Sequence, residues 1–185
     1  MNKKEMPQIT PLALKVEHVF GKFSEMARAK DKKAYQSFLL NIVADGVRFA
    51  AGKHLLIENT IGVMWRTRSA IFIITPAAVP EVVEILPSMA HDLHGQTFFY
   101  TTSWNLIDHA TIHNLSEHPN IRLRQMKLYC DYWGVVQDHE EILFANDAIT
   151  DESVECIISD DKGCVKFFNQ FIGLMVMANS QPLHI

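Results

Sequence analysis

The stretch Asp131-Tyr132-Trp133-Gly134-Val135-Val136-Gln137-Asp138 brings carboxylates and aromatic rings close together in the sequence. Asp131 and Asp138 could contact a polar or cationic group, and Trp133 and Tyr132 could stack on a flat or cationic ligand. Asp138 is also suited to open a tight turn between two antiparallel strands, because Asp side chains bond readily to nearby backbone N–H groups. We favour this turn role for Asp138.

Histidines are a second group of residues that could do chemistry, since the chain has nine of them. His109 and His113 are four residues apart, so on a helix they would share a face and could bind zinc or another transition metal. Asp108 or His118 could complete the set. The pattern lacks the glutamate of the His-Glu-x-x-His motif of metalloproteases, and two histidines on a surface helix are usually solvated. We therefore predict no metal and no other cofactor, and keep a metal-dependent enzyme as the alternative.

The elements that must position these residues alternate between helix and strand. Apolar spacing predicts helices over 55–68, 79–93 and 107–115, each followed by a strand, over 70–76, 95–102 and 121–124. The stretch that contains Trp133 forms a further strand, which leads into strands over 141–145 and 153–159 and a last, strongly apolar helix over 165–178. This order predicts an α/β fold with a mixed sheet flanked by helices.

The order of elements and the spacing within this stretch resemble one lobe of the phospholipase D-like fold. The signature of that family is His-x-Lys-x-x-x-x-Asp, in which the histidine is the nucleophile, the lysine binds phosphate and the aspartate orients the imidazole. Counting back from Asp138, the histidine position holds Asp131 and the lysine position holds Trp133. More narrowly, the Trp-Gly-Val-Val-x-Asp strand, the acidic turn and the Ile-Leu-Phe-Ala strand resemble the regulatory domain of TrmB-type archaeal transcription regulators.

The resemblance implies a site that has lost its chemistry. A carboxylate cannot replace imidazole as a nucleophile toward phosphorus without repelling the substrate, and indole carries no charge for phosphate. Asp131 and Asp138 would lie near the end of one strand, at the mouth where active relatives hold phosphate. Together with Tyr132 and Trp133 they would line an aromatic, acidic cleft that prefers a neutral or cationic small molecule. Trp133 could stack on that ligand or fill the vacated cleft, and we favour filling.

The first 52 residues lie outside the lobe pattern, which we assign to 53–185. Apolar residues at helical spacing over 12–23 and 34–51 predict an N-terminal helical extension that either packs on the lobe or dimerises. In the resembling regulators a winged helix and a dimerising coil precede the lobe, and this extension is too short for both. The second apolar run also lacks the polar residues of a recognition helix.

Composition and charge narrow the function further. The net charge of −4 disfavours sequence-independent binding to the phosphates of a nucleic acid, so we expect no direct nucleic-acid binding. No apolar stretch is long enough to span a membrane, which predicts a cytoplasmic protein. The apolar helix over 165–178 and the run over 39–49 carry more apolar surface than one lobe should cover, so we expect a homodimer. The sequence predicts a non-enzymatic regulatory or interaction module with a small-molecule or protein partner, which would reach DNA only through another protein.

Overall fold

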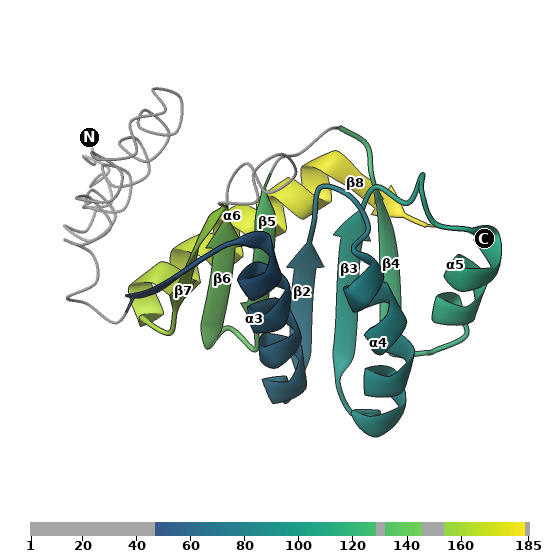
Figure 1. Cartoon of the computed structure of the whole chain (residues 1–185), viewed down its shortest axis with the longest axis horizontal. Coiled ribbons are helices and arrows are strands. Elements are labelled where there is room, and N and C mark those ends of the chain that lie inside the picture. The colour runs from purple at the N-terminus through teal and green to yellow at the C-terminus, as the bar shows by residue number, and fades with distance from the viewer. Residues whose placement is uncertain (1–46, 129–131, 146–153, 184–185) are drawn as a thin grey trace, which may run out of the picture. The chain divides into compact units, whose positions relative to one another are not determined.

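The computed structural model describes residues 47–128, 132–145 and 154–183 (Figure 1). The chain divides into two compact units, Met1–Ala44 and Asp45–Ile185, and all described residues belong to the second unit. The helix expected over 12–23 and the first part, 34–46, of the helix expected over 34–51 therefore lie outside the described residues, as does Asp131.

A single mixed sheet forms the centre of the second unit, with the strand order β1-β7-β6-β5-β2-β3-β4-β8. Strands β2, β3 and β4 run parallel to one another, and every other neighbouring pair is antiparallel. The strands are β1 (Val47–Ala51), β2 (Ala70–Ile74), β3 (Thr97–Thr102), β4 (Ile121–Met126), β5 (Trp133–Gln137), β6 (Glu141–Ala145), β7 (Glu155–Ser159) and β8 (Ser180–Pro182).

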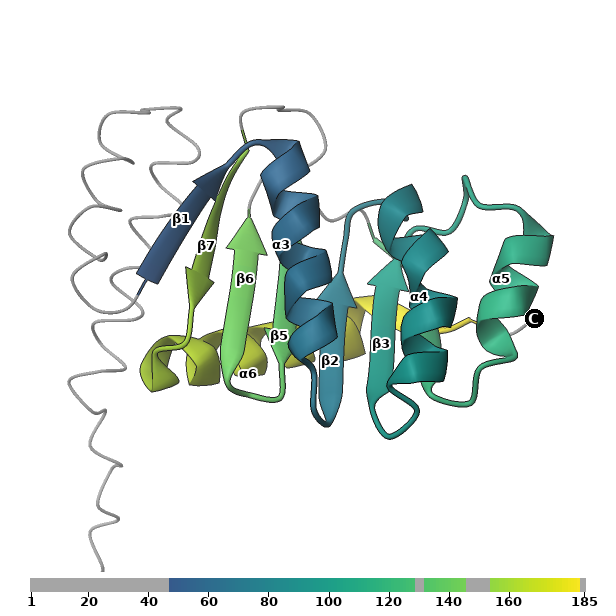
Figure 2. The ribbon, with the colours of Figure 1, turned by 60° about the horizontal axis from the view of Figure 1, so that its bottom comes forward.

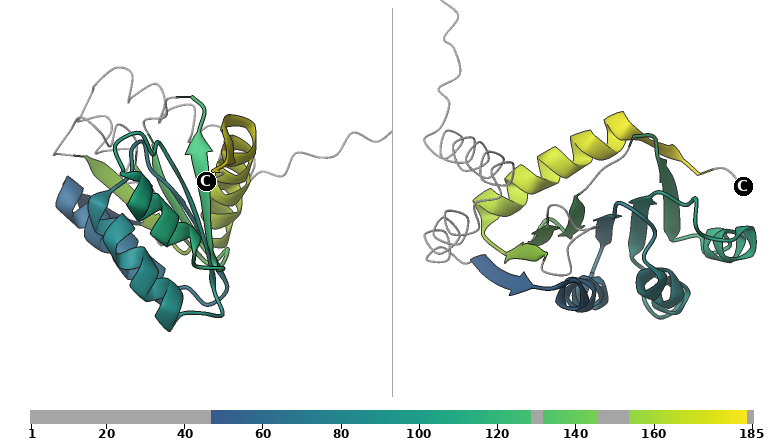
Figure 3. Two further views of the ribbon diagram at one scale, coloured as in Figure 1. Left: turned by 90° about the vertical axis from the view of Figure 1, so that its right-hand side faces the viewer. Right: turned by 45° about the horizontal axis from the view of Figure 1, so that its top comes forward.

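Helices cover both faces of this sheet. Helices α3 (Lys53–Arg66), α4 (Pro80–Asp92) and α5 (His109–Ser116) lie on one side, and α6 (Lys162–Asn179) crosses the other (Figures 2 and 3). Because β2, β3 and β4 are parallel, each connection must cross back over the sheet, and α4 and α5 make these crossings. The predicted α/β class, with a mixed sheet flanked by helices, is confirmed. None of the helices in the described part of the chain is long and apolar enough to cross a membrane.

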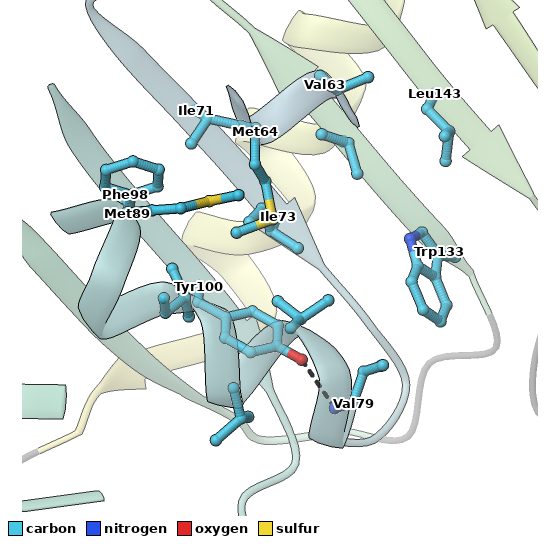
Figure 4. Packing of buried hydrophobic residues seen from close by; sticks show 14 of the residues in the cluster. Val63, Met64, Ile71, Ile73, Val79, Met89, Phe98, Tyr100, Trp133 and Leu143 are labelled. Atoms are coloured by element: carbon cyan, nitrogen blue, oxygen red, sulfur yellow. Dashed lines mark hydrogen bonds between the residues drawn. The ribbon is translucent and has the colours of Figure 1, made fainter. Parts of the chain in front are cut away.

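The larger core lies between the sheet and α3 and α4. Alternate residues of β2 and β3, including Ile71, Ile73, Phe98 and Tyr100, point into it (Figure 4). The intervening side chains lie on the opposite face of the sheet, which α6 crosses, as period-two alternation requires. Close approach of α6 also explains a glycine in β5, since a Cβ at Gly134 would come within 2.9 Å of Ile172 Cδ1.

The structure departs from the sequence prediction at both edges of the sheet. Residues 47–51 form strand β1, which pairs with β7, so the helix predicted to continue to Ala51 is wrong there. The edge strand β8 was not predicted at all. Both are short, and the sequence Val-Arg-Phe-Ala-Ala of β1 fits a helical pattern as well as a strand pattern.

Candidate functional site

Trp133, which occupies the position of the phosphate-binding lysine in the resemblance, is the first residue of β5 and belongs to the core. Its side chain is 2% exposed, and its Nε1 donates a hydrogen bond to Oγ1 of Thr60 on α3 at 2.9 Å. Thr60 is fully buried, and its hydroxyl donates in turn to the Leu56 carbonyl at 2.9 Å. The indole nitrogen therefore has its partner within the protein, and the ring fills space between α3 and the sheet (Figure 4).

Asp138 follows the last residue of β5 and fixes the β5–β6 turn. Its carboxylate accepts hydrogen bonds from the backbone N–H groups of Arg68, Ser69 and Ala70, at 2.8 Å for Ser69 and 2.7 Å for Ala70, and from the Gln137 side chain. The turn closes through Glu140 N, which donates to the Gln137 carbonyl at 2.8 Å. Asp138 thus joins the β5–β6 turn to the segment between α3 and β2.

The local backbone and the carboxylate environment both fit this turn role. Asp138 and His139 have φ values of 50° and 58°, which Asp tolerates better than most residues. Burial opposes ionisation of Asp138, but the N–H donors of Arg68, Ala70 and Ser69 outweigh it and lower the pKa of the carboxyl group.

Trp133 and Asp138 lie at opposite ends of β5. Five residues of strand at a rise of about 3.3 Å each separate them by roughly 16 Å. The expectation that residues of the stretch meet at one cleft mouth is therefore wrong for this pair. Tyr132 is half-buried and stacks against Phe144, with ring centroids 6.1 Å apart and planes at 29°. Ligand binding by the set Asp131, Tyr132, Trp133 and Asp138 stays a prediction.

A hydroxyl cluster that sequence analysis missed lies at the carboxyl ends of the parallel strands, the edge where open α/β sheets commonly bind ligands. The Tyr100 hydroxyl lies 3.0 Å from Thr75 Oγ1 and accepts from Val79 N at 3.0 Å. Thr75 Oγ1 also donates to Thr102 Oγ1 at 3.0 Å. Burial raises the pKa of Tyr100 to about 12, although bonds from Thr75 and Val79 oppose the rise, so the phenol stays protonated. These hydroxyls bond to one another in the interior, where they hold the start of α4 on the sheet.

Glu141 forms a second buried polar contact, near the amino-terminal end of β2 and so at the other end of the strands from the hydroxyl cluster. Its carboxylate lies 3.0 Å from Arg48 Nη2 and 2.7 Å from Arg66 Nη2, and its side chain is 11% exposed. It therefore joins β1 and α3 to β6. Both arginines are more than half exposed, so we assign this group a structural role.

The histidine pair on α5 has both side chains in solvent. His113 Nδ1 lies 3.6 Å from Glu117 Oε1. Asp108 caps the helix, because it accepts bonds from Thr111 Oγ1 at 2.7 Å and Thr111 N at 2.9 Å, and these bonds lower its pKa. The residues that the structure describes contain no group of three or more His, Cys, Asp or Glu that could hold a metal ion. The set of Asp108, His109, His113 and His118 is thus not assembled into a site.

Comparisons with known proteins identify the architecture. No family model and no curated protein sequence matches the chain. Among solved structures, TrmBL2, described as an archaeal chromatin protein with a novel mode of DNA binding, has a TM-score of 0.57 at 15% identity, over 94% of this chain and 70% of its own. NucT from Helicobacter pylori has a TM-score of 0.59 at 11% identity, over 74% and 98% of the two chains. Nuc from Salmonella typhimurium, a phospholipase D family member, has a TM-score of 0.53 at 12% identity, over 75% and 99%.

These likenesses confirm a phospholipase D-like fold with a TrmB-like structural relative. They also correct one expectation. Direct nucleic-acid binding was excluded from the net charge of the chain, but TrmBL2 combines this architecture with DNA binding. The exclusion is therefore wrong, because net charge says nothing about how positive side chains are grouped on one surface.

Proposed function

We propose that this chain is a non-catalytic regulatory module built on a single phospholipase D-like lobe. In this proposal the positions that handle phosphate in active relatives have been taken over by residues that stabilise the fold. The likeness to TrmBL2, a chromatin protein by its description, supports a setting in which the module regulates or organises DNA.

The buried state of Trp133 carries this proposal. A phosphate-binding residue must present a cation to an open cleft, whereas this side chain is neutral, 2% exposed and bonded to Thr60. Strand β5 reads Trp-Gly-Val-Val-Gln, so it also offers no imidazole or ammonium group. A nucleophile and a charge to stabilise the transition state are both required for phosphodiester hydrolysis, and β5 supplies neither.

We expect the purified full chain to show no hydrolysis of bis(p-nitrophenyl) phosphate above the buffer background between pH 5 and 9. The measurement is release of p-nitrophenol, with an active phospholipase D family nuclease as the positive control. The His109→Gln/His113→Gln double variant serves as the matched control, because both side chains are exposed and their replacement should leave the fold intact.

Hydrolysis that copurifies with the chain and survives in the double variant would refute the non-catalytic proposal. Hydrolysis that is lost in the double variant, and is lost from the wild type on treatment with EDTA, would instead favour the metal-dependent enzyme at His109 and His113. Stoichiometric zinc or iron in the purified protein would point the same way.

A further inference from the structure

One part of the sheet face on the α6 side carries aromatic and basic side chains at the surface. Helix α6 crosses this face diagonally, packing on β6 and β5 and ending at β8 (Figures 1 and 3). Beyond its path, Phe72, Phe99 and Arg122 form one cross-strand row on β2, β3 and β4, since Phe72 pairs with Phe99 and Phe99 with Arg122. The two rings are half-buried and Arg122 is exposed.

Phe99 lines a cavity in addition to stacking on Phe72. Phe72 and Phe99 are stacked with centroids 4.5 Å apart and planes at 7°. Because they come from adjacent strands, each uses one face on the other. A cavity of about 320 Å³, which Phe99 helps to line, lies beside β4. It is lined by Phe99 of β3, by residues 121–124 of β4, by Ser116 of α5 and by Pro182 and Leu183.

The two arginines make this cavity positively charged. Within the described residues, neither forms an ion pair with a carboxylate. Arg124 is held in place by Ser180, because its Nε donates to Ser180 Oγ at 2.8 Å and its Nη2 to the Ser180 carbonyl at 3.2 Å. Arg122 donates from Nη1 to its neighbour's carbonyl, Ile121 O, at 3.2 Å. Further N–H groups of both guanidinium groups are available to an anion.

We propose that this cavity, which we call the Phe99 slot, binds single-stranded nucleic acid. A base would stack on the Phe99 ring where it lines the cavity, and Arg122 and Arg124 would contact the adjoining phosphate. A flat ring next to fixed cations is the chemistry that single-strand binding surfaces use. An acidic peptide would use the arginines but not the ring face. Paired bases in a duplex cannot reach Phe99 without leaving the stack.

This inference goes beyond the proposed regulatory function and does not depend on it. The Phe99 slot lies beside β4, where Ser116 of α5 and residues 182 and 183 also line it, whereas Trp133 belongs to the core between β5 and α3. A result that refutes one proposal would not refute the other, because the first concerns phosphodiester hydrolysis and the second concerns binding of a single strand.

The test is fluorescence anisotropy of the full chain with a labelled twelve-nucleotide single strand at low salt. Phe99→Leu should weaken binding roughly 5- to 100-fold, the range seen when one base loses its aromatic partner. Arg122→Gln should weaken binding at low salt, and the slope of log affinity against log salt should fall by about 0.7. The first matched control is Phe72→Leu, which also breaks the Phe72–Phe99 ring pair but changes no residue that lines the slot. The second is Arg68→Gln, which removes an exposed arginine near Asp138 and away from the slot. Both controls should stay within about 2-fold of wild type, well below the effect of one stacked base.

Melting curves verify that each variant is folded before binding is compared. The proposal is supported only if Phe99→Leu and Arg122→Gln weaken single-strand binding and both controls do not. It is overturned by absence of binding, by equal losses in Phe99→Leu and Phe72→Leu, or by a duplex of the same sequence binding as tightly. Full competition by a mononucleotide at equal nucleotide concentration would assign the slot to free nucleotides, and stronger binding of polyglutamate would assign it to an acidic protein.

Discussion

Replacing Trp133 with alanine is expected to lower the free energy of unfolding by about 3–5 kcal/mol, the usual cost of truncating a large buried aromatic side chain. The indole is 2% exposed and lies between α3 and the sheet, so its removal leaves a cavity and breaks the bond to Thr60. Denaturation in urea, followed by circular dichroism, measures the change. The protein is expected to remain unable to hydrolyse phosphodiesters.

Trp65 provides the matched control, because it is a tryptophan on the same helix, α3, that Trp133 contacts, and it is 44% exposed. Trp65→Ala should cost less than about 1 kcal/mol, as for most surface substitutions. Trp133→Phe should fall between the two, since it keeps a ring but loses the hydrogen bond. If Trp133→Ala were no more destabilising than Trp65→Ala, the indole would not be a core residue.

Replacing Asp138 with alanine is expected to destabilise the protein by about 2–4 kcal/mol, because backbone N–H groups of Arg68, Ser69 and Ala70 lose their acceptor together. Alanine also tolerates the φ of 50° less well than aspartate does. Asp138→Asn should cost less, since asparagine keeps one acceptor oxygen and accepts this backbone conformation. The same urea titration compares the three proteins.

The Asp138 contribution should also depend on pH. Its pKa in the folded protein is lowered, so the stabilisation is present above the unfolded value of about 3.9 and is lost as pH falls through the folded pKa. The stability difference between wild type and Asp138→Asn should therefore be largest near neutral pH and shrink below about pH 4. An unchanged difference at pH 3 would mean that the charge of Asp138 does not stabilise the turn.

Periodicity predicted most of the fold because most elements carry a strong pattern. The apolar run of β2, the amphipathic α3 and α4, and the apolar α6 each lie within a few residues of their predicted positions. The edge strands were missed because β1 is the end of an apolar run with helical spacing, and β8 is three residues long and contains a proline. Only pairing with β7 and β4, respectively, reveals these strands, and pairing between distant segments leaves no periodic signal.

The candidate site was harder to predict than the fold. The spacing of Trp133 and Asp138 correctly placed both on or beside one strand, and turn chemistry indicated the role of Asp138. Yet a separation of five residues along a strand already places their side chains at opposite ends of β5, which the spacing alone did not indicate. The Phe99 slot was invisible in the sequence, because its row depends on the register of β2, β3 and β4. Aromatic residues in a strand usually indicate core, and only the path of α6 leaves these two at the surface.

The exchange of tryptophan indole protons tests the central claim most directly, namely that Trp133 is a core residue at a former phosphate position. The chain has three tryptophans, so an NMR spectrum resolves three indole signals that single Trp→Phe variants can assign. We predict that the Trp133 Nε1–H exchanges slowly, close to the rate set by global unfolding, and does not shift when inorganic phosphate is added, whereas the half-exposed Trp65 exchanges fast. Rapid exchange of the Trp133 proton, or a saturable shift of its signal with phosphate, would show an open anion site and contradict the account.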